Sequence, residues 1–306
     1  MRIAFAGTPD VAVPTLRALV DAGHDVAVVI TRPDAPVGRK RVMTPSPVAI
    51  AAADLGIPVI KAARLDAEAT TAIMDYAVDL GVIVAYGGLV KEPLLSAPAH
   101  GWINLHFSLL PLWRGAAPVQ RSLMANDPVT GIAVFQLVAA LDAGAIFARE
   151  EVAVPPDATA GEFLHDLAER GAPIVARVVH EIETGEAVAV AQTGEPSVAA
   201  KLEREDGRID WNRESAAVYA HIRGVTPEPG AFTTIDDVPV KILRAARSGS
   251  AVRPAPGEIR QDGKAVIVGT ATAPLTLVTV QPTGKAAMPA ADWWRGLRAE
   301  SVKAGS

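Results

Sequence analysis

Asn104 and His106 are the two side chains of this 306-residue chain best suited to chemistry. They lie two residues apart in segment 103–111, which begins as a strand and ends as a loop. Alternate residues of a strand point to the same face, and open parallel sheets bind ligands at the carboxyl ends of their strands. An amide can donate to a developing oxyanion. An imidazole can donate to the same oxygen when charged, or exchange protons with an amine when neutral. The pair therefore suits acyl transfer to an amine.

A carboxylate is the natural third partner of such a pair, because it orients the imidazole and stabilises the imidazolium. Asp142 lies in Leu141-Asp142-Ala143-Gly144, a tight turn between two expected strands, from which a carboxylate can be aimed inward. Each residue also has a plainer explanation, namely a buried histidine bonded to backbone and an aspartate that only forms the turn. The arrangement as a whole favours a catalytic site.

The elements that position these residues follow from the hydrophobic pattern. Short apolar strands are expected at residues 2–6, 26–31, 59–60, 80–85 and 103–105, with helices at 11–22, 48–55 and 67–78 between them. This alternation predicts an α/β fold, with a doubly wound, mostly parallel, Rossmann-like sheet. Two further strands at 131–138 and 145–154 flank the turn at 142–144. A long helix at 159–184 follows, capped by Thr159 with Glu162.

The composition and hydrophobic pattern of the chain change after residue 185. Residues 186–206 are polar and lack periodicity, as expected of a linker. Beyond them, short β-rich segments at 231–235, 238–243, 265–268 and 275–280 are separated by Gly, Pro and Asp. They predict a small OB-like β-barrel closed by a helix near 290–298, with Trp293 and Trp294 in its core. We expect a catalytic domain at 1–188, a linker at 189–206 and a C-terminal domain at 207–306.

Composition excludes several kinds of site. The chain has no cysteine, which excludes disulfides and thiolate metal sites. Its six histidines show no metal-ligand spacing, so we expect no metal. A lone Gly7 after the first strand is not a dinucleotide fingerprint. The N-terminal residues do not resemble a signal peptide, and no apolar run is long enough to span a membrane. We therefore expect a cytoplasmic protein.

Charge is unevenly distributed along the chain. The net charge is −5, yet residues 207–306 hold 13 basic and nine acidic side chains, a net +4. A basic C-terminal part is compatible with a polyanionic partner, although a difference of this size is also ordinary scatter. Three adjacent cations, Arg39, Lys40 and Arg41, lie in a loop rich in Pro and Gly. They suit phosphate contacts. The alternative is that they only belong to a solvated surface loop, as most short basic runs do.

The central segment resembles the signature of the folate-dependent formyltransferases. The matching stretches are residues 104–111 (NLHFSLLP), 113–118 (WRGAAP) and 141–144 (LDAG). The resemblance extends over essentially the full chain. It includes residues 4–10 (AFAGTPD), 45–47 (PSP), 201–211, 223–224, 229–231, 256–259 and 281–288. The C-terminal stretches resemble the branch of the family whose acceptor is a tRNA.

The resemblance implies a substrate pair and roles for residues. It implies transfer of a formyl group from 10-formyltetrahydrofolate to the free amino group of the methionyl moiety of initiator methionyl-tRNA. It implies no metal, no membrane partner and a monomer. By position in the motif, the roles are catalysis for Asn104, His106 and Asp142, folate binding for Ser108, Leu109, Leu110 and Pro111, and tRNA binding for Arg39, Lys40 and Arg41.

The sequence departs from the family pattern at two positions. Gly88 is an extra glycine in residues 86–89, and Glu228 stands between two prolines where the family often has Trp.

Two alternative functions stay open. One is formyl transfer to a small amine, such as a purine precursor ribonucleotide or an amino sugar. The C-terminal domain argues against it, since a small substrate needs no such domain. The other is an RNA-binding barrel protein whose first domain has lost its chemistry, against which the intact Asn104, His106 and Asp142 argue.

Overall fold

The chain divides into two compact units in its computed structural model, which describes residues 1–38 and 40–305. The first unit comprises Met1–Pro118, Thr130–Val152 and Leu164–Ala199. The second comprises Val119–Val129, Ala153–Phe163 and Ala200–Ser306. The expected domains at 1–188 and 207–306, with a linker at 189–206, stay a prediction.

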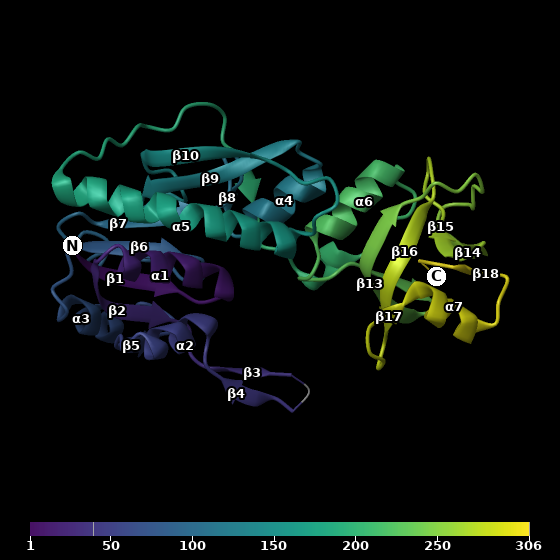
Figure 1. Ribbon diagram of the computed structural model, residues 1–306, viewed down its shortest axis with the longest axis horizontal. Coiled ribbons are helices and arrows are strands. Elements are labelled where there is room, and N and C mark those ends of the chain that lie inside the picture. Colours follow the sequence, from purple (N-terminus) through teal and green to yellow (C-terminus); the bar gives the residue numbers. More distant parts are fainter. Residues whose placement is uncertain (39, 306) are drawn as a thin grey trace. The chain divides into compact units, whose positions relative to one another are not determined.

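A mostly parallel sheet forms the centre of the first unit (Figure 1), in the order β10-β9-β7-β6-β1-β2-β5. Neighbouring strands from β7 to β5 run parallel, whereas β9 is antiparallel to β7. The predicted doubly wound α/β sheet is confirmed. Its strands are β1 Arg2–Gly7, β2 Asp25–Thr31, β5 Val59–Lys61, β6 Leu80–Val84, β7 Trp102–His106, β9 Val129–Gln136 and β10 Ile146–Ala153.

Helices begin where capping residues stand before apolar stretches. The Ser46 side chain accepts from the backbone N–H of Ala49, and that of Asp66 accepts from Ala69. The helices α1 and α2 pack against β2, and α2 and α3 pack against β5. Their bounds are α1 Val13–Asp21 after the 3-10 turn η1 Asp10–Ala12, α2 Pro47–Asp54, α3 Ala67–Met74 and α5 Ala160–Thr184.

Close packing holds β6 and β7 together. Gly81 of β6 pairs with Trp102 of β7, and the Trp102 ring is fully buried. A Cβ on Gly81 would stand 2.0 Å from that ring, so only glycine fits there. The Trp102 indole also donates to the carbonyl oxygen of Leu94 at 2.8 Å. These contacts set the register of β7, the strand that ends at His106.

The predicted basic loop folds as a hairpin (Figure 1). Its strands, β3 Ala35–Val37 and β4 Val42–Thr44, pair antiparallel. Lys40 and Arg41 lie in its turn and are exposed, whereas Arg39 lies outside the described residues. Arg32 holds neighbouring loops instead, because its guanidinium donates to the carbonyl oxygens of Ala63 and Gly87.

An antiparallel sheet dominates the second unit, in the order β12-β13-β16-β15-β14-β18. The backbone N–H of Gly305, just after β18, donates to Thr234 of β12 at 2.8 Å and so joins the two edge strands. Trp293 and Trp294 are buried in its core, as predicted. The elements are α4 Pro118–Ala125, η2 Arg204–Gly207, α6 Ser215–Gly224, β12 Phe232–Ile235, β13 Val238–Arg247, β14 Glu258–Asp262, β15 Ala265–Val268, β16 Leu275–Pro282, β17 Met288–Pro289, α7 Ala290–Leu297 and β18 Ser301–Lys303.

Candidate active site

The end of β7 presents the first two predicted site residues. His106 is the last residue of the strand and is buried, and Asn104 lies two positions earlier and is half-buried. Their spacing places both side chains on one face. The edge of the His106 ring meets Phe135 of β9, with ring centroids 6.2 Å apart and planes at 88°. The strand and this aromatic contact hold the imidazole in place.

The hydrogen bond of His106 decides which ring nitrogen carries the proton. Its Nε2 lies 2.9 Å from the carbonyl oxygen of Trp113, which can only accept, so Nε2 is the donor. The neutral ring therefore has its lone pair on Nδ1. Burial lowers the pKa of His106 below its ordinary value of 6.5, and the charge of Asp142 and the Trp113 carbonyl oppose that effect. Burial thus favours the neutral form of the imidazole, in which Nδ1 can accept a proton.

Asp142 reaches this site from the turn between β9 and β10. Its carboxylate is buried, and Oδ2 lies 3.9 Å from Nδ1 of His106. That separation is too long for a hydrogen bond but short enough for strong electrostatic interaction. The same Oδ2 accepts the backbone N–H of Gly115 at 2.7 Å. The carboxylate is thus held beside the imidazole, where it stabilises a positive charge on the ring.

The predicted folate segment forms the loop directly after β7. Ser108 is fully buried, and its hydroxyl donates to the carbonyl oxygen of Leu112 at 2.6 Å. Leu110 is fully buried and packs in a small cluster with Ala133 and Phe135. Leu109 is half-buried and Pro111 buried. The side chains of Ser108 and Leu110 therefore hold the shape of the loop, and its role in folate binding stays a prediction.

Three groups that hold His106 and Asp142 in place were not predicted from the sequence. They are the carbonyl of Trp113, the N–H of Gly115 and the side chain of Gln192. The first two lie in the segment 113–118 that carried the resemblance, although their backbone roles were not expected. Gln192 belongs to the expected linker. That stretch contains β11 Val198–Ala199, which pairs with β8 Arg114–Gly115. Two-residue strands leave no periodic pattern in a sequence.

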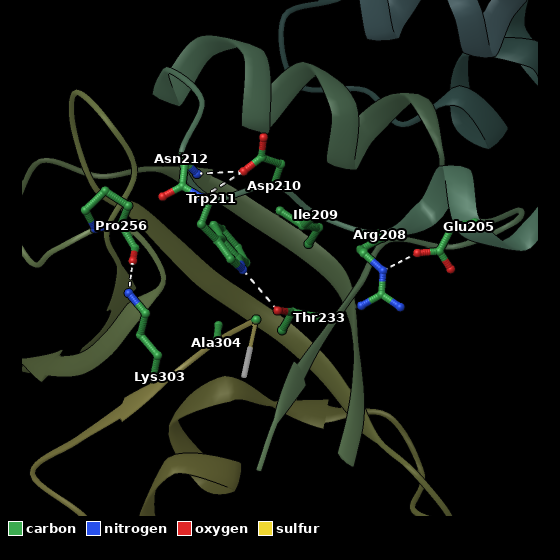
Figure 2. Close-up of a pocket in the computed structure, with 11 residues that line it drawn as sticks. Glu205, Arg208, Ile209, Asp210, Trp211, Asn212, Thr233, Pro256, Lys303 and Ala304 are labelled. Carbon is green, nitrogen blue, oxygen red and sulfur yellow. Dashed lines mark hydrogen bonds and ion pairs between the residues drawn. The ribbon is translucent and has the colours of Figure 1, made fainter. Parts of the chain in front are cut away.

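The second unit contains a separate polar hollow of about 540 Å³ (Figure 2). Trp211 forms part of its wall, and its indole donates to the Thr233 hydroxyl at 3.0 Å. The Arg208 guanidinium pairs with the Glu205 carboxylate at one side of the hollow. Its charged groups are engaged with neighbours, and the site residues Asn104, His106 and Asp142 lie in the other unit.

Comparison with known proteins identifies the family. A family model described as formyl transferase matches residues 1–179, and one described as formyl transferase, C-terminal domain, matches residues 201–298. The chain belongs to the formyl transferase family. The methionyl-tRNA formyltransferase of Clavibacter michiganensis subsp. michiganensis (strain NCPPB 382) is 58% identical over 99% of this chain and 100% of its own length.

Solved structures share the fold at lower identity. HypX from Aquifex aeolicus in complex with tetrahydrofolic acid is 17% identical and superimposes with a TM-score of 0.65 over 96% of this chain and 46% of that longer one. The N-formyltransferase from Helicobacter canadensis, with folinic acid and dTDP-3-aminofucose, is 15% identical, with a TM-score of 0.67 over 92% of this chain and 98% of that one. At these identities the likeness concerns the fold alone.

Neither a membrane-spanning helix nor a metal-binding cluster occurs in the described part of the chain. Within residues 1–38 and 40–305, no helix is both long and apolar enough to cross a membrane. The same residues contain no group of three or more His, Cys, Asp or Glu side chains arranged to bind a metal ion.

Proposed function

We propose that this chain transfers a formyl group from 10-formyltetrahydrofolate to the amino group of the methionyl residue on initiator methionyl-tRNA, with Asn104, His106 and Asp142 at the reaction centre. The observation that carries the proposal is the pairing of a buried imidazole with a carboxylate 3.9 Å from its free nitrogen, two residues after Asn104 on the same strand. The full-length relative named for this activity supports the choice of substrates.

The reaction needs two proton movements and stabilisation of one negative charge. A bond forms between the methionyl nitrogen and the formyl carbon, and the bond from that carbon to the folate nitrogen breaks. The attacking amine loses a proton, and the leaving folate nitrogen gains one. The formyl oxygen carries negative charge in between. An enzyme accelerates such a step chiefly by orientation and electrostatics.

The three residues divide these tasks. Nδ1 of His106 accepts the proton of the amine, because Nε2 is already protonated and bonded to Trp113. Asp142 then stabilises the imidazolium, whose Nδ1–H faces the carboxylate. The Asn104 amide donates to the oxygen that becomes negative, and the positive charge of the ring stabilises that oxygen electrostatically. The ring returns its proton to the leaving nitrogen.

The folate supplies the formyl group, and residues 108–111 would hold it. This loop follows β7 without a break, so it borders His106. The bond from Ser108 to Leu112 and the burial of Leu110 stabilise its conformation. A fixed loop beside the imidazole fits a substrate whose formyl group must be presented at one angle.

The tRNA is assigned to the basic hairpin and the second unit. Lys40 and Arg41 are exposed in the hairpin turn, and Arg39 is adjacent to them in the sequence. Residues 207–306 carry the +4 charge that suits phosphate contacts farther along the tRNA. We further propose that the protein acts in the cytoplasm as a monomer.

A small amine as acceptor is the main alternative, and a dTDP-amino sugar bound to the Helicobacter canadensis enzyme is an example in a protein of this fold. A relative named methionyl-tRNA formyltransferase aligns with 99% of this chain, which favours tRNA as the acceptor. The test supplies 10-formyltetrahydrofolate labelled in the formyl carbon, with methionyl initiator tRNA, an amino-sugar nucleotide or glycinamide ribonucleotide as acceptor. We expect label on the tRNA-linked methionine. Label on a small amine alone would refute the tRNA assignment.

A further inference from the structure

The side chain of Gln192 connects two backbone segments that meet at Asp142. Its amide nitrogen donates to the carbonyl oxygens of Asp142 and Gly144, each at 2.8 Å. Its amide oxygen accepts from Arg114, at 2.6 Å from Nη2 and 3.2 Å from Nε. One side chain therefore joins the Asp142 turn to the loop that precedes Gly115.

The chemistry of the partners sets the orientation of this amide. Carbonyl oxygens only accept and a guanidinium only donates, so the nitrogen must face the turn and the oxygen must face Arg114. Two N–H groups and two lone pairs are the full hydrogen-bonding capacity of a glutamine side chain. All four are used, so Gln192 is held in one position.

Segment 190–199 is itself fixed on both sides of Gln192. Before it, Val190 exchanges two backbone hydrogen bonds with Ile146, at 2.8 and 2.9 Å. After it, the Ser197 hydroxyl accepts the N–H of Trp113 at 2.8 Å, and the Ser197 carbonyl accepts the N–H of Arg114 at 2.8 Å. Gln192 thus projects from a segment anchored to β10 at one end and to β8 at the other.

Asp142 needs such support because its backbone is in the left-handed region. Its φ is 44°, a conformation that is unfavourable for a residue other than glycine. Gly115 holds the carboxylate of Asp142, and Gln192 holds its carbonyl. Without Gln192 the backbone of the turn would lack two hydrogen bonds, and the carboxylate could move away from His106.

We infer that Gln192 is a positioning residue for the reaction, holding the Asp142 carboxylate at its distance from the His106 imidazole. This inference rests on the role proposed above for Asp142. Gln192 acts through Asp142 and Arg114 and needs no contact with either substrate. Gln192 lies in the first unit, as do Asp142 and Arg114.

The test is a double-mutant cycle. Gln192→Met keeps the length of the side chain and removes all four hydrogen bonds. Gln192→Glu keeps an acceptor for Arg114 but cannot donate to the turn. Each is made in the native chain and in Asp142→Ala, and kcat and KM are measured for each substrate in turn while the other, methionyl-tRNA or 10-formyltetrahydrofolate, is saturating. Gln136→Met is the matched control, because the Gln136 amide also donates to two carbonyls, those of His100 and Trp102.

In the native chain, both Gln192 variants should lower kcat about 10- to 100-fold, the scale of a displacement of about 1 Å in a catalytic group. KM should change less than about twofold. In the Asp142→Ala background the same substitutions should lower kcat less than about twofold, because coupled residues are not additive. Gln136→Met should keep native kcat. If Gln192→Met does not fold, the kinetics of Gln192→Glu alone provide the test.

Failure of this inference and failure of the proposed function give different results. A near-native kcat for both Gln192 variants, or the same reduction in both backgrounds, removes Gln192 from positioning while Asp142→Ala remains impaired. Near-native turnover of Asp142→Ala itself refutes the role of Asp142, and this inference with it.

Discussion

Nδ1 of His106 and Oδ2 of Asp142 lie 3.9 Å apart, and the other ring nitrogen of His106 is bonded to Trp113. The carboxylate therefore faces the one nitrogen that is free to take up a proton. The carboxylate offsets part of the penalty that burial imposes on the charged imidazole, which is what a buried base needs.

Asp142→Asn should lower the pKa of His106. Burial lowers that pKa and the negative charge of Asp142 raises it, so removing the charge leaves burial less opposed. Titration of the imidazole by NMR measures the shift. A pKa in Asp142→Asn that equals or exceeds the native one contradicts the assigned electrostatic role.

Acidification from pH 7.5 to pH 5.5 should destabilise the fold. The pKa values of His24, His106 and His221 are all lowered from 6.5, chiefly by burial. Below that pH the unfolded chain binds more protons than the folded one, so the free energy of unfolding falls as pH decreases. Urea denaturation at pH 7.5 and 5.5 measures the change. His221→Gln should show a weaker dependence, and an unchanged stability at both pH values contradicts the expectation.

Gly144→Ala should destabilise the first unit. A Cβ at this position would stand 1.7 Å from the carbonyl oxygen of Gln136, so the backbone must shift. Such overpacking costs about 1–3 kcal/mol, and thermal unfolding reports it as a lower Tm. Gly249→Ala is the control, because a Cβ there has no heavy atom within 4 Å. Equal Tm values for the two variants would show that the turn adapts freely.

Much of the site could be predicted because its signals are local. The short apolar segment at 103–105 indicates a strand, and the polar residues Asn104 and His106 stand two apart at its end. The turn at Asp142 is equally local. Gln192 was not predictable, because its partner Arg114 is 78 residues away and its segment has no periodicity. Likewise, the hairpin around Lys40 has three-residue strands, too short to distinguish from a loop.

A folate analogue should protect residues 108–111 from hydrogen exchange. This loop borders His106, and a ligand held there shields its backbone N–H groups; Pro111 has none. Exchange measured by mass spectrometry with and without 5-formyltetrahydrofolate gives the result. Protection confined to other segments would move the folate site elsewhere.

Replacing Arg39, Lys40 and Arg41 with alanine should weaken tRNA binding and leave folate binding unchanged. The slope of log affinity against log salt should fall by about one unit for each phosphate interaction that the substitutions remove. Binding of methionyl-tRNA at several salt concentrations measures that slope. Lys264→Ala and Lys285→Ala test whether lysines of the second unit contribute independently. Normal binding and formylation by the triple variant at physiological salt would show that the hairpin is only a solvated surface.

The single-turnover rate of formyl transfer by His106→Ala tests the central claim most directly. With saturating 10-formyltetrahydrofolate and methionyl initiator tRNA, rapid quenching isolates the chemical step from product release. We expect a rate at least about 100-fold below native, the usual contribution of a general acid or base, with near-native affinities for both substrates. A near-native rate would place the proton transfer on another residue and contradict the mechanism built on His106 and Asp142.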